Sequence, residues 1–531
     1  MAASDEQREV LDFLNDPATH GGEKPTTVET HGAVVFLLKD RVYKLKRAIR
    51  FSFMDFSTAE KRRASCRAEI NLNQRTAPDL YLGTVPVRRS GGGDLSLGHI
   101  GSDPDDWIET LVLMRRFEDT FADSYPTEQE LVRVAEDIAG FHARAPLAPG
   151  AGGAEKTWRI LEGNLTSIGG AIGVDSSLLS GLLDALRAIH EKGAAELDVR
   201  AASGFVRDCH GDLHLANICR FRGVPTLFDC IDFNPDFSRI DTLYDLAFLL
   251  MDLDAHGMKS GSSRVLNRYL ECRPEEMAGL SLLPLFLSMR AQVRAKVAFA
   301  AKGLADDTAV AAEKGQEAAR YLSLARDYLG SGPVLLIAVG GASGTGKSTL
   351  SRAVAATKGA VILRSDAIRK RRLGLVRETD RLPPEAYSSN VSEAVYAEMG
   401  ADCKTVLAEG MIAIADATFT HPESRESIET VARAAGVPFL GIWLELPENE
   451  AADRVESRRN DVSDATPDVV HGQFKHDWGT IDWHRIDARL SKRTMPNSRN
   501  ARVDMLRPGN GSGPRSERGR TGAARASVSL S

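Results

Sequence analysis

The sequence predicts a multidomain protein with an α+β region first, an α/β region with a parallel sheet second, and a disordered basic tail. Three observations support this fold class. The chain has 531 residues, which is more than one hydrophobic core usually holds. Its hydrophobic share of 43% and charged share of 26% are typical of a soluble globular protein. The order of strand-like and helix-like segments changes near residues 330 and 490, which indicates domain boundaries there.

The first region begins with short strands and continues with helices. "AVVFLLKD" and "RVYKLKR" flank a turn at residues 39–41, and a helix-like stretch covers residues 58–75. "LYLGTVPVRR" and "WIETLVLMRRF" are further strands, and from Thr127 apolar residues recur at helical spacing. We therefore expect an N-terminal segment at 1–24 and a domain at 25–329. Its strand-rich lobe covers about 25–120 and its helical lobe about 121–329.

The second region follows a Gly- and Pro-containing linker at residues 330–333. Short apolar strands such as "VLLIAV", "AVILR" and "MIAIAD" alternate with helical stretches over residues 333–488. This alternation predicts a parallel sheet covered by helices on both faces. Residues 489–531 are rich in Arg, Ser and Gly and hold few large apolar side chains. They cannot bury a core, so we expect a disordered basic tail.

Composition and charge exclude several classes of function. The formal net charge is −6, which argues against a general binder of nucleic acid or membrane surfaces. The acidic N-terminus has no apolar run, and the longest apolar stretches are too short to cross a bilayer. The six cysteines form no CxxC pair, so they indicate neither a zinc ribbon nor a disulfide scaffold. We expect a cytoplasmic protein with no membrane partner; its oligomeric state cannot be read from the sequence.

A glycine-rich phosphate loop is the most specific motif of the chain. Residues 341–348 fit G-x-x-x-x-G-K-[ST] at every fixed position, between an apolar strand and a helix-forming stretch. The loop backbone and the helix N-terminus can hold phosphate groups. Lys347 can reach the β- and γ-phosphates as a catalytic group, and Ser348 can bind Mg²⁺. The predicted ATP-binding residues are Gly341, Ala342, Ser343, Gly344, Thr345, Gly346, Lys347, Ser348 and Thr349.

Two acidic residues and two arginines complete this predicted site. Asp366 follows a strand on the side of the sheet where ligands bind, and can accept the proton of an acceptor hydroxyl. Alternatively, Ser365 or Asp366 caps the following helix. Asp416 ends another strand and can hold magnesium. Arg454 and Arg458 lie on one helix face and can close over the transferred phosphate, or form a solvated basic face.

These elements resemble the small P-loop kinases, the group of gluconate kinase, shikimate kinase, chloramphenicol phosphotransferase and polynucleotide kinase. The resemblance covers residues 333–488. It implies ATP at residues 341–349, a substrate base at Asp366, and a lid that carries Arg454 and Arg458.

The segment "RDCHGDLHLANICR" carries the second predicted site. Asp212 and Asn217 match the D-x-x-x-x-N spacing of a kinase catalytic loop, in which the Asp accepts the proton and the Asn binds a metal ion. A further acidic metal ligand should follow on a nearby strand, where Asp229 and Asp232 stand. A zinc site formed by His210, Asp212 and His214 is the alternative. It leaves Asn217 and Asp232 unexplained.

The segment from Ile231 resembles the aminoglycoside phosphotransferases, which have a bilobal protein-kinase-like fold. Asp232 follows Ile231 as in the family's first unit, and the resemblance makes it the metal ligand. The second unit fits Arg239, Asp241, Tyr244, Asp245, Ala247 and Phe248. The resemblance also implies a strand lysine, Lys44 in preference to Lys46, paired with Glu69 to steer the ATP phosphates. A G-x-G-x-x-G before the lysine strand is missing, and Gly32 is the one glycine there.

The order of the two domains resembles a bacterial family of fused phosphotransferase/ATP-binding proteins. We expect two ATP sites that use Mg²⁺ and transfer the γ-phosphoryl group to a hydroxyl of a small molecule such as a sugar or amino sugar. One alternative is a nucleotide-sensing regulatory protein with a degenerate kinase domain. Another is a kinase of nucleic-acid ends, which the acidic net charge disfavours.

Overall fold

The computed structural model describes residues 5–30, 32–50, 54–171, 176–305, 307–330, 332–457 and 466–489. Up to Ile486 these residues belong to one compact unit, and Asp487 begins another. Of the predicted tail, all but residue 489 lies outside the described residues. Within the described part of the chain, every helix is too short or too polar to cross a membrane.

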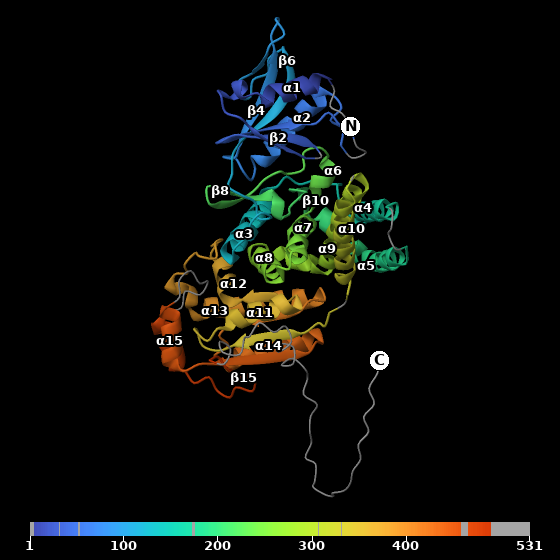
Figure 1. Ribbon diagram of the computed structural model, residues 1–531. Helices are drawn as coiled ribbons and strands as arrows, with labels where there is room; N and C mark the ends of the chain where they lie inside the picture. The colour runs from blue at the N-terminus through green and yellow to red at the C-terminus, as the bar shows by residue number, and fades with distance from the viewer. Residues whose placement is uncertain are drawn as a thin grey trace, which may run out of the picture. The chain divides into compact units, whose positions relative to one another are not determined.

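The first sheet has six strands in the order β1-β2-β3-β6-β4-β5, with antiparallel neighbours. Val10 and Leu14 pack on one face of it, and Cys66 and Ile70 pack on the other. The N-terminal segment that the sequence sets apart therefore packs as part of this lobe (blue in Figure 1). The elements are α1 (Asp5–Asn15), β1 (Thr26–Glu29), β2 (Ala33–Leu37), β3 (Arg41–Lys46), α2 (Ala59–Asn73), β4 (Tyr81–Arg89), β5 (Leu95–Leu97) and β6 (Trp107–Arg115).

The helical lobe follows and contains two short two-stranded sheets. Thr127 caps α3 and forms a capping box with Glu130, which explains why the helix begins there. Sheet β7–β10 (Val206–Asp208 with Arg239–Asp241) and sheet β8–β9 (Ile218–Phe221 with Val224–Leu227) are antiparallel. The main helices are α3 (Glu128–Arg144), α4 (Ala154–Gly169), α5 (Ser176–Ala202), α7 (Thr242–Ala255), α8 (Lys259–Cys272), α9 (Leu283–Leu304) and α10 (Thr308–Asp327).

The second sheet has the strand order β12-β13-β11-β14-β15, and its first four strands are parallel neighbours as predicted. Ile337 and Val339 face α11, whereas Leu336 and Ala338 face α13 and α14, so helices cover both faces (Figure 1). The elements are β11 (Leu336–Gly340), α11 (Lys347–Lys358), β12 (Val361–Arg364), α12 (Ser365–Arg372), α13 (Ser389–Ala408), β13 (Ala413–Asp416), α14 (Pro422–Ala435), β14 (Phe439–Glu445), α15 (Glu448–Glu456), α16 (Pro467–Phe474) and β15 (His484–Asp487).

One apolar cluster joins the helical lobe to a face of the second sheet. Leu270 of α8, Leu280 of the helical lobe, Leu336 of β11 and Met399 of α13 all belong to it. The predicted boundary at residues 330–333 therefore marks a change of fold type, while packing continues across it. The predicted fold class, with a kinase-like bilobal region before an α/β P-loop region, is confirmed.

Candidate active sites

The phosphate loop lies between β11 and α11 and depends on its glycines. Gly344 has φ +88°, and a Cβ atom there would lie 2.4 Å from the carbonyl oxygen of Ala451 on α15. Gly346 has φ +93° and forms the N-cap of α11. Since L side chains rarely adopt such φ values, both positions favour glycine. The loop can thus curl against α15 and present its backbone at the N-terminus of α11.

Two side chains hold the loop in its conformation. The Lys347 ammonium donates to the carbonyl oxygens of Gly341 (2.9 Å) and Ala342 (3.0 Å), so it lies across the loop. Gln473 of α16 accepts from the Ser343 backbone N–H at 2.8 Å and donates to the Ser343 hydroxyl at 3.1 Å. Sequence reasoning missed Gln473, because it stands 130 residues beyond Ser343 and belongs to no motif.

Asp416 is buried at the end of β13, beside the loop. Its Oδ2 atom has no hydrogen-bond partner among the described residues. Burial raises the pKa of Asp416, against the charges of Lys347 and Arg364 and a hydrogen bond from Ser348. An unpartnered carboxylate oxygen next to a serine hydroxyl is a donor set that fits Mg²⁺. The geometry thus brings together Ser348 and Asp416, the two predicted metal ligands of this site.

The remaining predicted residues of the second site are Asp366, Arg454 and Arg458. Asp366 lies in the first turn of α12, is one-quarter exposed, and accepts from Arg369 Nη1 at 3.3 Å. The alternative that Ser365 or Asp366 caps this helix is wrong, because Arg364 is the N-cap residue and no side chain caps the helix. Arg454 is half-buried on α15, one turn beyond Ala451. Arg458 lies outside the described residues. The roles of Asp366 and Arg454 stay predictions.

In the first domain, two lysines of β3 share one buried glutamate of α2. Lys44 Nζ lies 2.9 Å from Glu69 Oε1 and 2.6 Å from Asp229 Oδ1. Lys46 Nζ lies 2.8 Å from Glu69 Oε2 and 2.6 Å from Asp232 Oδ2. The predicted Lys44–Glu69 contact is therefore present. Lys46, however, is the lysine that joins Glu69 to the predicted metal ligand Asp232.

Opposing effects set the charge states of this cluster. Burial opposes ionisation of Glu69, but the two ammonium groups outweigh it and lower the pKa of Glu69 to about 2. Burial raises the pKa of Asp232, with the charge of Lys46 acting against it. Asp229 has φ +61°, which is rare for a residue other than glycine and is typical of strained functional loops.

Replacing Glu69 with glutamine is expected to destabilise the protein by about 3–5 kcal/mol at neutral pH, because two buried ammonium groups lose a shared anion. Ionised Glu69 stabilises the fold fully above its usual pKa of 4.5, and this contribution disappears as the pH falls toward about 2. The Tm difference between variant and wild type, measured by scanning calorimetry, should therefore shrink over that interval. Glu60→Gln, at the exposed start of the same helix, is the control. A Tm difference that stays constant down to the acid range would contradict this assignment.

The catalytic loop brings Asp212 and Asn217 together. Asn217 Nδ2 donates to the backbone oxygen (2.9 Å) and to the Oδ2 atom (3.0 Å) of Asp212. His214 Nε2 lies 3.3 Å from the same Oδ2 atom. Burial opposes ionisation of Asp212, but the charge and hydrogen bond of His214 outweigh it and hold the pKa of Asp212 below its usual value. The Asp212 side chain is 37% exposed, so an acceptor hydroxyl can reach it.

Asp245 of α7 holds the backbone of this loop in place. It is fully buried and accepts from the backbone N–H groups of His210 (3.1 Å) and Gly211 (2.8 Å). His142 of α3 lies 3.1 Å from Asp245 and 2.9 Å from the Tyr269 hydroxyl of α8. Asp245, which the sequence placed in the family pattern, is thus the support of the catalytic loop.

The zinc alternative at His210, Asp212 and His214 is wrong. His210 Nε2 bonds the backbone oxygen of Phe228 at 2.9 Å. Within the described part of the chain, the one group of three with ligand atoms close enough for a metal is His142, Cys209 and Asp245. That group is buried, and its His142 and Asp245 are the loop supports just described.

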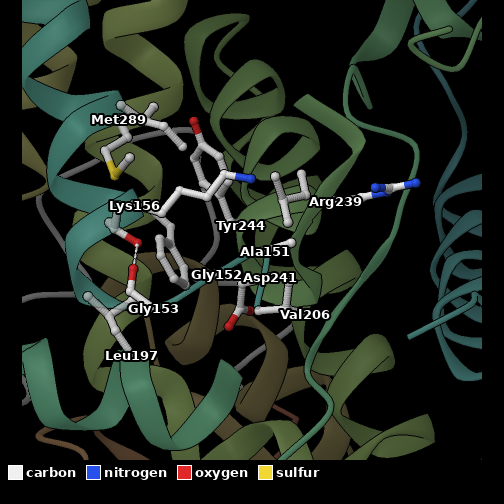
Figure 2. Close-up of a pocket in the computed structure, with 14 residues that line it drawn as sticks. Ala151, Gly152, Gly153, Lys156, Leu197, Val206, Arg239, Asp241, Tyr244 and Met289 are labelled. Carbon is white, nitrogen blue, oxygen red and sulfur yellow. Dashed lines mark hydrogen bonds between the residues drawn. The ribbon is translucent and has the colours of Figure 1, made fainter. Parts of the chain in front are cut away.

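A small cavity is lined by residues of α4, β10, α7 and α9 (Figure 2). Lys156, Arg239, Asp241, Tyr244 and Met289 are among its lining residues. Tyr244, which lines it, lies under Arg290, whose guanidinium carbon is 3.8 Å from the centre of the ring. Arg290 also donates to the Gly211 oxygen at 3.1 Å, so it links the cavity wall to the predicted catalytic loop.

The strand, loop and helix around Lys347, with Ser348 beside Asp416, define a P-loop domain in the second part of the chain. The family model of the AAA domain matches residues 336–476, so the predicted P-loop domain is confirmed. The chain belongs to the family of the mycobacterial protein named Uncharacterized protein Rv2004c, from Mycobacterium tuberculosis. The two are 30% identical over 480 residues, which cover 86% of this chain and 91% of that protein. Uncharacterized protein Mb2027c of Mycobacterium bovis matches with the same values.

Solved structures match parts of the chain at low identity. Choline kinase from Cryptosporidium parvum is 11% identical, with a TM-score of 0.39, over 61% of this chain and 96% of its own. A gluconokinase from Sinorhizobium meliloti is 16% identical, with a TM-score of 0.22, over 31% of this chain and 84% of its own. Similarity at this level says nothing of the substrate of this chain.

Proposed function

We propose that the protein is an ATP-dependent phosphotransferase with two nucleotide sites, each of which transfers the γ-phosphoryl group to a hydroxyl of a small molecule. The observation that carries this proposal is the Asp212 carboxylate, which accepts from Asn217 Nδ2 at 3.0 Å and lies 3.3 Å from His214 Nε2. Phosphoryl transfer needs positioning and charge neutralisation more than covalent chemistry. The residues of both sites offer these two contributions.

In the first site, Asp212 orients the acceptor hydroxyl and takes its proton at Oδ1 or Oδ2. Its low pKa makes it a weak base, which suits a loose transition state in which the proton leaves late. Lys46 and Lys44 neutralise the phosphates, and Asn217 and Asp232 would hold magnesium. The metal, when bound, adds positive charge at the phosphate oxygens.

In the second site, the loop N–H groups and Lys347 bind the phosphates, while Ser348 and Asp416 would hold the metal. Asp366 takes the proton of the acceptor, and Arg454 neutralises the transferred group. In both proposed sites a carboxylate would take the proton while cationic groups hold the phosphates.

A nucleotide-sensing role for the first domain is the second candidate, and one observation favours it. Both lysines of β3 are already paired with carboxylates, and the β1–β2 turn offers the single glycine Gly32 to cover phosphates. A domain of this kind would bind ATP without turning it over.

The test is a screen of sugars, amino sugars, polyols and nucleosides with the full-length chain, because the two domains share one apolar cluster. ATP consumption that depends on an acceptor and on Asp212 supports the two-enzyme proposal. Tight ATP binding at the first site without consumption, for every acceptor class, favours the sensing role.

A further inference from the structure

A buried ion pair crosses from the kinase-like domain to the second site. Arg364 at the end of β12 donates from Nε to Glu271 Oε1 (2.6 Å) and from Nη2 to Glu271 Oε2 (2.8 Å). Glu271 belongs to α8 of the kinase-like domain, and both side chains are at most 7% exposed. Bidentate, desolvated contacts of this kind fix the orientation of a guanidinium.

The same arginine is the direct neighbour of the predicted metal ligand. Arg364 and Asp416 are partners in the parallel pairing of β12 and β13, so their side chains leave the sheet on one face. Arg364 Nη1 and Asp416 Oδ2 are both buried, and neither has a hydrogen-bond partner among the described residues. A free donor and a free acceptor of opposite charge therefore stand side by side without forming an ion pair.

Three further contacts hold β12 and Arg364 in this arrangement. Glu378 accepts from Arg364 Nη2 at 3.0 Å. Asn267 of α8 donates to the Ala360 oxygen at 3.2 Å and accepts from the Ile362 N–H at 2.6 Å. The edge of β12 is thus fastened to α8, and the guanidinium of Arg364 is turned toward Glu271.

We propose that Glu271 is a positioning residue of the P-loop site: it holds Arg364 away from Asp416, so that Asp416 Oδ2 stays available to Mg²⁺. The inference rests on the proposed function of that site. Without the Glu271 charge, the guanidinium turns to the free Asp416 oxygen and competes with the metal. The kinase-like domain thereby sets the metal affinity of its neighbour.

The test measures the Mg²⁺ dependence of ADP binding to the full-length protein by titration calorimetry. The second site is identified as the binding that Lys347→Ala removes. Glu271→Gln is expected to raise the half-saturating Mg²⁺ concentration of that binding by about tenfold or more, as residues that orient metal ligands do. Glu271→Gln/Arg364→Gln should restore the wild-type value, because the competing guanidinium is gone. Arg364→Gln alone should bind Mg²⁺ at least as tightly as wild type.

Glu275→Gln is the matched control, because Glu275 is exposed on the segment after α8 and should leave the Mg²⁺ dependence unchanged. An unchanged Mg²⁺ dependence in Glu271→Gln overturns the inference. A raised half-saturating Mg²⁺ concentration in Glu271→Gln that the double variant does not bring back to the wild-type value also overturns the inference. Glu271 would then act through domain packing. If Lys347→Ala removes no ADP binding, the proposed function of the second site fails instead. If Glu271→Gln does not fold, a higher half-saturating Mg²⁺ concentration in Arg364→Gln than in wild type overturns the inference, and a value at or below that of wild type supports it.

Discussion

Lys347→Ala, made in a chain that already carries Asp212→Asn, is expected to lower kcat for ATP turnover at the P-loop site by about 10²–10³-fold. The Lys347 ammonium lies across the loop on the oxygens of Gly341 and Ala342. From there it is placed to reach phosphate oxygens when a nucleotide enters. Its removal takes away a fixed positive charge in a site where few mobile ions can replace it. Steady-state ADP release is the measurement.

Lys358→Ala at the far end of α11 is the control for this prediction, since it removes a lysine of the same helix outside the loop. Retained turnover in Lys347→Ala, together with unchanged ADP affinity, would mean that the loop holds no phosphate. The Asp212→Asn background keeps the first site from masking the loss.

Asp212→Asn, in a chain that carries Lys347→Ala, is expected to reduce acceptor-dependent ATP consumption at the first site by about 10²–10⁴-fold. The amide keeps the shape of the side chain and still accepts from Asn217, but it cannot take the proton of a hydroxyl. ATP affinity should change little, because in the proposed mechanism Asp212 contacts the acceptor and the lysines contact the nucleotide. The split between a lowered kcat and an unchanged Kd for ATP is the informative result.

Asp236→Asn is the control here, because Asp236 is 77% exposed and pairs with Lys156 near the same loop. Equal losses in Asp212→Asn and Asp236→Asn would point to a general electrostatic effect. Full activity in Asp212→Asn would show that the first site is not a catalytic centre.

Local sequence patterns predicted the parts of both sites that depend on neighbouring residues. The loop at 341–349 needs glycines at fixed places because its backbone has positive φ there, so its sequence is recognisable by itself. The Asp212–Asn217 contact spans five residues and has the same local origin. The parallel pairing in the second sheet also follows from alternating strands and helices.

Contacts between distant residues were not predictable from one sequence. Nothing around Lys46 distinguishes it from Lys44, since both lie on the same strand face and the choice depends on Asp232, 186 residues away. Glu271 in a helix and Arg364 at the end of a strand stand 93 residues apart in different folds. The helix cap at Arg364 was also missed, because Ser365 and Asp366 have the better capping side chains although the strand continues up to them.

The hydrogen bonds of the Asn267 amide protect an outer strand while the protein is synthesised. Strand β12 is the outer strand of its sheet, and Asn267 occupies its backbone groups at Ala360 and Ile362 as a neighbouring strand would. An uncovered outer strand can recruit other chains and aggregate. During synthesis the kinase-like domain emerges from the ribosome first, so α8 is already available when β12 appears. Translation order therefore protects the P-loop domain, and expression of residues 333–488 alone should yield aggregated material.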